Sequence, residues 1–173
     1  KICNSATFVD SRIQLSRIQI VRGEKTTVTE YVANHYQQCH VVAFEDIVRH
    51  SRRYDLITCT NVLSAIPCEK TVNSIFIHMQ RLLNNEGKVL FVNQYRNSYF
   101  KKYKLGKRHL FGYLFNNRNI VSYYGIIRPN QIEKLLSNAG FFVEKVWCIG
   151  EINFVEAKRA VINYPKGADN VLF

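Results

Sequence analysis

One stretch of the sequence, residues 54–94, constrains the fold more than any other part of the chain. It begins with a run rich in apolar and β-branched residues, Tyr54–Thr60, and ends with a second such run at residues 88–93. Between them, apolar side chains recur at the spacing of one helix face, at Val72, Ile75, Phe76, Met79, Leu82 and Leu83. Gly87 follows, where a left-handed residue would close the helix. The stretch therefore predicts a strand, a helix and a second strand, which form the βαβ unit of a parallel sheet.

Weaker patterns predict further elements on both sides of this unit. β-branched and apolar runs indicate strands, and helical spacing with flanking proline and glycine indicates helices. The predicted elements are a helix at 4–20, strands at 26–32, 41–44, 141–149 and 152–161, and a helix between Pro129 and Gly140. Residues 163–173 show no periodicity and are expected to form a loose C-terminal tail.

Two glycine-terminated helix endings give this order of elements a family resemblance. They read Leu82-Leu83-Asn-Asn-Glu-Gly87 and Leu135-Leu136-Ser-Asn-Ala-Gly-Phe141. They resemble the LLxxxG and LLxxAGF endings that precede the fifth and sixth strands of class I S-adenosylmethionine-dependent methyltransferases. The resemblance implies a Rossmann-like, mostly parallel α/β sheet with helices on both faces and the last strand antiparallel. It also implies one domain over residues 1–162 that transfers methyl groups from S-adenosylmethionine.

The resemblance assigns polar residues at the carboxyl ends of strands to the cofactor, because ligands bind there in such sheets. Glu30 is expected to hold the ribose hydroxyls; the alternative is a solvated glutamate on a strand. Glu45 and Asp46 are expected near the adenine amino group, although Asp46 could equally cap a turn. Thr60 and Asn61 are expected beside the methyl donor, although Asn61 could simply end its strand. No catalytic residue is assigned.

The glycine-rich loop of the family is absent from the sequence. No GxGxG pattern or degenerate version of it occurs, and the chain begins at Lys1, with Met79 as its only methionine. Both observations are explained if the chain begins just after the loop, inside the first helix. We therefore expect these 173 residues to bind S-adenosylmethionine weakly or not at all. The alternative function is that of a catalytically inactive methyltransferase-like domain that binds nucleic acid or protein.

The positive charge of the chain, +11 in total, is concentrated in one region. Residues 87–132 contain nine Lys or Arg and no Asp or Glu, together with ten of the 22 aromatic residues. The region includes a predicted basic aromatic insert or cap at 95–128, which is too long for an ordinary connection. Three interpretations stay open: a nucleic-acid surface, a lid over an anionic or small substrate, and a solvated basic hairpin. Its candidate substrate-binding residues are Tyr95, Arg96, Tyr99, Lys101, Lys102, Lys104, Lys107, Arg108 and His109.

Other sequence signals argue against several classes of protein. The five cysteines form no CxxC pair, which disfavours a disulfide framework or a zinc site and favours a reducing cytoplasm. The five histidines show no metal-binding spacing, and no apolar run approaches the roughly 20 residues that span a bilayer. Asn61 is not followed by the Pro-Pro-aromatic motif of base-amine methyltransferases. Cys68 follows Pro67, as in cytosine-C5 enzymes, but lies too far beyond the strand to be expected as a nucleophile.

Overall fold

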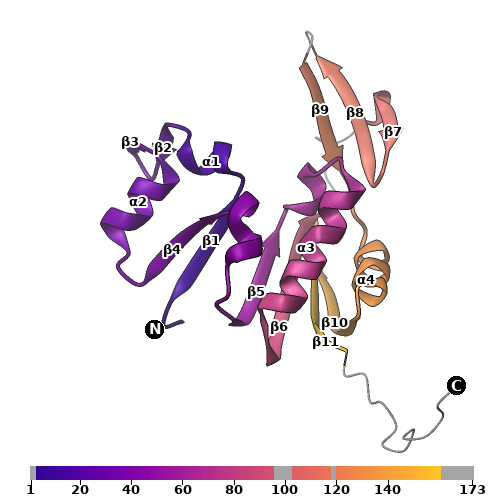
Figure 1. Cartoon of the computed structure of the whole chain (residues 1–173). Coiled ribbons are helices and arrows are strands. Elements are labelled where there is room, and N and C mark those ends of the chain that lie inside the picture. Colours follow the sequence, from indigo (N-terminus) through magenta and orange to yellow (C-terminus); the bar gives the residue numbers. More distant parts are fainter. Residues whose placement is uncertain (1–2, 96–102, 118–119, 161–173) are drawn as a thin grey trace, which may run out of the picture. The chain divides into compact units, whose positions relative to one another are not determined.

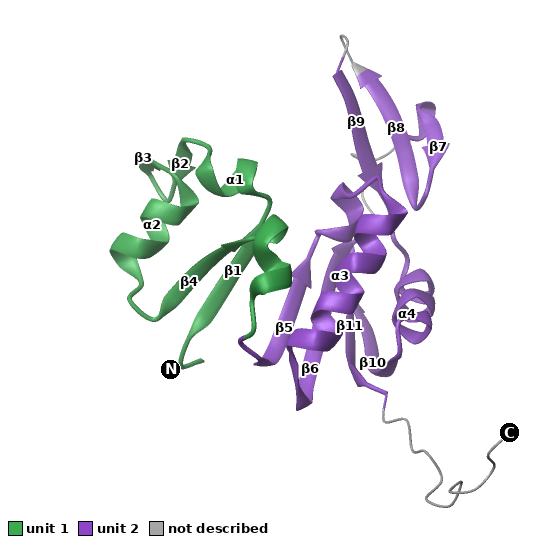
Figure 2. Cartoon of the chain, in the orientation of Figure 1, with its two compact units in different colours: residues 1–51 green, residues 52–173 purple. Residues whose placement is uncertain are grey.

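The computed structural model describes residues 3–95, 103–117 and 120–160. The chain divides into two compact units, residues 1–51 and 52–173 (Figure 2), and each is described by itself. The predicted tail at 163–173 lies outside the described residues. In the described ranges, no helix is both long and apolar enough to cross a membrane.

Unit 1 is built on two parallel strands. β1 (Ala6–Asp10) pairs with β4 (Cys39–Ala43), so that Ala6 lies opposite Cys39 and Asp10 lies opposite Ala43. The chain between these strands forms α1 (Arg12–Ser16), the hairpin of β2 (Gln19–Val21) and β3 (Glu24–Thr26), and α2 (Val28–His35). A 3-10 helix, η1 (Phe44–Arg49), follows β4 directly. The predicted strand at 41–44 is thus confirmed as β4.

Two of the predictions in unit 1 are wrong. Residues 4–20 hold β1 and the short helix α1 instead of one helix. Residues 26–32 lie mostly in α2 instead of a strand, because Thr27 and Glu30 form a capping box that begins this helix. The capping hydrogen bonds at its first turn outweigh the weak strand preference of its β-branched residues.

Unit 2 contains a four-stranded sheet in the order β10-β11-β6-β5. β5 (Tyr54–Thr60) and β6 (Leu83–Gln94) are parallel and are joined by η2 (Leu63–Ala65) and α3 (Glu69–Leu82), which confirms the βαβ unit. α4 (Pro129–Asn138) follows at the predicted place, and β10 (Phe141–Ile149) and β11 (Ile152–Arg159) form an antiparallel hairpin. β11 also runs antiparallel to β6. The fold is α/β, but this sheet is only partly parallel, contrary to the prediction.

The core of unit 2 lies between β6, β11 and the two helices (Figure 1). Val89, Phe91 and Asn93 alternate along β6 with no exposed surface, and the Phe91 ring lies 5.6 Å from that of Phe76 on α3. The prediction that Gly87 caps α3 is wrong. The helix ends at Leu82, and Gly87 lies within β6, where a side chain would press against the Tyr54 carbonyl at 2.9 Å. Gly87 is thus required for close packing.

Part of the predicted insert forms a second sheet, which we call the cap sheet. It consists of β7 (Lys107–His109), β8 (Gly112–Asn117) and β9 (Ile120–Gly125), paired in an antiparallel meander (Figure 1). Gly112 allows β8 and β9 to approach, because a Cβ atom there would lie 1.8 Å from the Tyr124 carbonyl oxygen.

Candidate functional site

The carboxyl ends of β1 and β4 bring acidic residues to one edge of unit 1. Asp10 is the last residue of β1, and Glu45 and Asp46 lie in η1, directly after β4. Because the two strands are parallel and in register from Ala6 to Asp10, these ends lie side by side. Glu45 and Asp46 therefore occupy the strand edge at which the sequence predicts cofactor-binding acids.

Both of these acids are bound by Arg12, the first residue of α1. Its backbone N–H donates to Glu45 Oε2 at 3.0 Å and to Oε1 at 3.2 Å, and its guanidinium donates to Asp46 Oδ2 at 2.8 Å. Glu45 thus satisfies an N–H of the first turn of α1, which has no partner within the helix. The two acids are held in place by the chain itself, so a ligand would have to share them with Arg12.

Asp10 is a candidate that the sequence analysis missed. Its Oδ1 accepts the backbone N–H of Ser11 at 2.7 Å, while Oδ2 has no partner among the described residues, and the side chain is exposed. The sequence pattern predicts a helix at residues 4–20, so the end of a strand at Asp10 is not expected from it. A signal was present: the short run Ala6–Val9 is bounded by Asn4-Ser5 before it and by Asp10-Ser11 after it.

Glu30 does not end a strand, so the premise of its predicted role is wrong. It lies in the first turn of α2, where its carboxylate accepts the Thr27 N–H at 3.2 Å and the hydroxyls of Thr27 and Thr26 at 2.9 and 3.1 Å. These hydrogen bonds, the Thr27 backbone N–H first, hold the pKa of Glu30 below its usual value. All three hydrogen bonds end on Oε2, so this oxygen of the carboxylate is used in starting α2.

Thr60 and Asn61 lie where they were predicted, at the carboxyl end of β5. Asn61 adopts a left-handed conformation (φ 55°), and its N–H donates to the Val92 carbonyl at 2.8 Å. Its Oδ1 accepts the Gln94 N–H at 2.9 Å, and its carbonyl accepts the Ser64 hydroxyl at 2.8 Å. Asn61 therefore joins the ends of β5 and β6, and both Thr60 and Asn61 are exposed at this strand end.

Two fully buried amides lie beside this edge. Asn93 on β6 is opposite Asn153 on β11, and both have no exposed surface. The Asn153 amide nitrogen donates to the Ile127 carbonyl at 3.0 Å. Neither amide atom of Asn93, nor Oδ1 of Asn153, has a partner among the described residues. The sequence pattern does not indicate this pair of buried amides. Asn93 occupies an inward-facing position of β6, like Val89 and Phe91, where an apolar residue is expected.

The candidate substrate-binding residues are placed only in part. Lys104, Lys107 and Arg108 are exposed on or beside β7. His109 Nε2 lies 2.7 Å from the Pro67 carbonyl oxygen, which can only accept, so this nitrogen carries a proton and is not available as a base. Tyr95 donates its N–H to the Glu151 carbonyl at 2.9 Å. The remaining candidates, Arg96, Tyr99, Lys101 and Lys102, lie outside the described residues.

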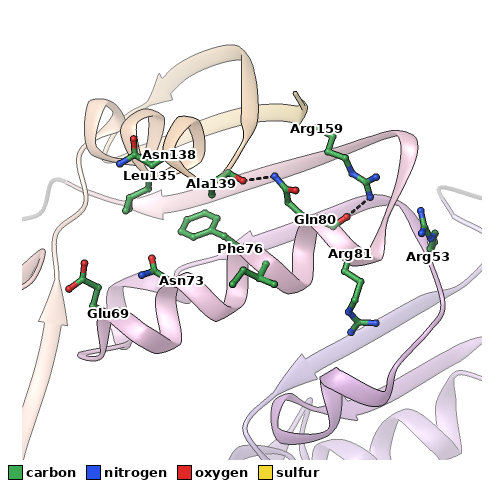
Figure 3. A pocket seen from close by; sticks show the side chains of 11 residues that line it. Arg53, Glu69, Asn73, Phe76, Gln80, Arg81, Leu135, Asn138, Ala139 and Arg159 are labelled. Carbon is green, nitrogen blue, oxygen red and sulfur yellow. Dashed lines mark hydrogen bonds between the residues drawn. The ribbon is translucent and has the colours of Figure 1, made fainter. Parts of the chain in front are cut away.

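Two cavities lie away from the carboxyl strand ends. One, of about 770 Å³, lies in unit 2 along α3 beside α4 (Figure 3). At its polar end Gln80 donates to the Ala139 carbonyl, and Arg159 donates to the carbonyls of Gln80 and Leu83, so Arg159 closes the C-terminus of α3. The other, of about 390 Å³, lies in unit 1 at the amino ends of β1 and β4. No group of three metal-ligating side chains occurs among the residues that the structure describes.

Cys68 is the thiol for which we predict the highest reactivity. It is exposed just before α3, and the hydroxyl of Thr71, followed by its backbone N–H, lowers the pKa of the thiol. Burial instead raises the pKa of Cys59 to about 12. Iodoacetamide at neutral pH should therefore alkylate Cys68 and spare Cys59 in the folded protein, as read by peptide mass mapping.

The Thr71→Ala variant provides the control for this prediction. It should raise the pKa of Cys68 and move the pH profile of its alkylation to higher pH, while Thr29→Ala should leave that profile unchanged. Equal rates for Cys68 in both variants would contradict the role given to Thr71.

The arrangement of elements is that of a known fold. A SAM-dependent methyltransferase from Methanosarcina mazei matches with a TM-score of 0.59 and 14% identity, over 90% of this chain and 82% of that chain. The DhpI–SAH complex matches with a TM-score of 0.54 and 10% identity, over 78% of this chain and 62% of that chain. The chain therefore has the fold of S-adenosylmethionine-dependent methyltransferases.

The comparison of sequences gives a relative without an assigned activity. The uncharacterized protein YmfD of Escherichia coli K12 is 44% identical over 144 residues, which make up 83% of this chain. The match spans 65% of that protein, just under two thirds of its length. No family model matches the chain.

Proposed function

We propose that the protein transfers a methyl group from S-adenosylmethionine to an acceptor. The observation that carries the proposal is the position of Asp10: an exposed carboxylate at the carboxyl end of a parallel strand, with one oxygen left to accept hydrogen bonds. The methyltransferase fold supplies the context. Class I methyltransferases often hold the ribose hydroxyls with a carboxylate at such a strand end, and Asp10 is proposed for this role in place of Glu30.

The residues present fit part of the cofactor. Asp10 suits the ribose, since a carboxylate is a strong acceptor for hydroxyl donors. Glu45 or Asp46 would meet the adenine amino group only by sharing with Arg12. No glycine occurs before Gly23, which turns the β2–β3 hairpin, so residues 1–22 offer no glycine-rich loop to the methionine portion.

The roles proposed for residues of unit 2 follow from the resemblance to methyltransferases. The bound cofactor would supply an electrophilic methyl group on its sulfonium. Thr60 and the Asn61 amide nitrogen would orient the acceptor or the cofactor by hydrogen bonds. The Asn61 N–H donates to the Val92 carbonyl and its Oδ1 accepts the Gln94 N–H, which joins the ends of β5 and β6. Rate enhancement would come mainly from the approach and alignment of the two reactants.

Calorimetric titration with S-adenosylhomocysteine tests the proposal on the full-length product of the reading frame that contains the chain. We expect binding in the micromolar range. Asp10→Ala should weaken it about tenfold or more, since a hydrogen bond to a charged group contributes about 1.5–3 kcal/mol. Glu30→Gln is the matched control and should leave the affinity unchanged, because the Glu30 carboxylate is used within α2.

Two outcomes would contradict parts of this assignment. If Asp10→Ala bound as tightly as the unaltered protein while Glu30→Gln did not, the ribose would not be held at the end of β1. Micromolar binding to the 173-residue chain would contradict the expectation that a chain without a glycine-rich loop binds the cofactor weakly or not at all.

A second candidate function is a methyltransferase-like domain that binds nucleic acid or protein without catalysis. The lack of glycine in residues 1–22 and the positive charge of residues 87–132 favour it. In that case the titration would detect no cofactor binding by the full-length protein, while binding through the cap sheet would persist.

A further inference from the structure

We propose that the cap sheet binds single-stranded nucleic acid through one face and its β7 edge. The inference deepens the proposed function, because it names the class of acceptor that would reach the edge at Asn61. The binding itself does not depend on methyl transfer. It rests on the position of the cations, on a row of one arginine and two tyrosines across the three strands and on the attachment of the cap sheet to the main sheet.

The cations lie along an edge and do not converge on one cavity. β7 is an outer strand of the cap sheet, and its consecutive residues Lys107 and Arg108 point to opposite faces. Lys104, just before this strand, is also exposed. No acidic residue lies between Gly87 and Ile132 in the sequence to neutralise them. An extended row of positive charge suits a polymer with regularly spaced phosphates better than a small anion.

One face of the cap sheet presents a row of one arginine and two tyrosines. Arg108 on β7, Tyr113 on β8 and Tyr124 on β9 are consecutive cross-strand partners, so their side chains share a face. The ring of Tyr103 stacks on that of Tyr124, with centroids 5.4 Å apart and an angle of 20° between planes. This face therefore already accommodates stacked rings.

Tyr113 is the member of the row that is open to a further ring. It is half-buried, has no ring contact with another described residue, and lies between Arg108 and the stacked pair at Tyr124. A base could stack on its ring while the flanking phosphates meet Arg108 and its neighbours on the β7 edge. Stacking of this kind needs an unpaired base, which favours single strands over duplexes.

The cap sheet is attached next to the predicted cofactor edge. Gly125 packs against η2, where a Cβ atom would lie 3.2 Å from the Ser64 Cα, and Ser64 donates to the Asn61 carbonyl. His109 contacts the Pro67 carbonyl at 2.7 Å. A strand bound on the cap sheet could therefore extend toward Asn61.

Fluorescence anisotropy with labelled mixed-sequence oligonucleotides of about 12 nucleotides tests the proposal without any cofactor. We expect the single strand to bind more tightly than the matching duplex. Tyr113→Ala should weaken single-strand binding about fivefold or more, and Tyr113→Phe should retain it, since the ring is kept. Arg108→Ala should lower the slope of log affinity against log salt by about one, whereas Lys134→Ala on α4 should not. Circular dichroism melting of each variant checks that it folds.

Equal binding by Tyr113→Ala and Tyr113→Phe would overturn the stacking role of Tyr113. Equal salt slopes for Arg108→Ala and Lys134→Ala would overturn the assignment of phosphate contacts to the β7 edge. Binding to vesicles of anionic phospholipid in place of oligonucleotides would also overturn the proposal. Because the assay contains no cofactor, a failure of methyl transfer would leave its result unaffected, and the two proposals can fail separately.

Discussion

Phe91→Ala is expected to lower the free energy of unfolding of unit 2 by about 3–5 kcal/mol, the range found when a large buried aromatic is cut back to alanine. Phe91 has no exposed surface, lies on the central strand β6, and contacts Phe76 of α3 with ring centroids 5.6 Å apart. Its removal would leave a cavity between the sheet and α3 that rigid neighbours such as Val89 and Val155 can fill only in part.

The measurement is urea-induced unfolding followed by the fluorescence of Trp147, the single tryptophan, which lies on β10 and reports on unit 2. Phe142→Ala provides the matched control, because Phe142 lies on the same strand as the reporter but is 58% exposed. Its loss should cost at most about 1 kcal/mol, the contribution of an exposed cation–π contact with Lys158. Equal losses in the two variants would show that β6 is not the centre of the core.

The sequence predicts unit 2 better than unit 1, for a physical reason. α3 has 14 residues with a continuous apolar face, and β6 and β11 each contain a run of apolar and β-branched residues, so the local sequence pattern identifies them. The elements of unit 1 are mostly three to eight residues long, and in such short windows propensity and periodicity carry little information. The decisive signals there are single capping contacts, as at Thr27 and Ser11.

The residues of the candidate site show the same difference between the two units. Thr60 and Asn61 are predictable because they end a clear strand, whereas Asp10 is hidden by the wrong helix and Glu30 is misplaced by the wrong strand. The Thr27-x-x-Glu30 pattern is a capping-box signature that could have corrected the error at Glu30, because it marks the start of α2. The link between Arg12 and the acids Glu45 and Asp46 spans 33 and 34 residues, and no local pattern encodes it.

The buried amides Asn93 and Asn153 should respond in opposite directions to the same substitution. Asn93→Leu keeps the branched shape and removes two buried polar atoms that no described residue satisfies, so it should raise the free energy of unfolding by about 1–3 kcal/mol. Asn153→Leu removes the donor to the Ile127 carbonyl, a group within a fully buried residue, and should lower it by about 1 kcal/mol or more.

The two variants serve as controls for each other, because the residues face each other across β6 and β11 and differ only in the bond to Ile127. Urea unfolding with Trp147 fluorescence measures both. If Asn93→Leu were instead destabilising by a similar amount, its amide would be satisfied in solution by a bound water or another polar group. If Asn93→Leu raised the free energy of unfolding, the Asn93 amide would lower the stability of the native protein. This is expected of a residue that is retained for a role at the adjacent strand edge and not for folding.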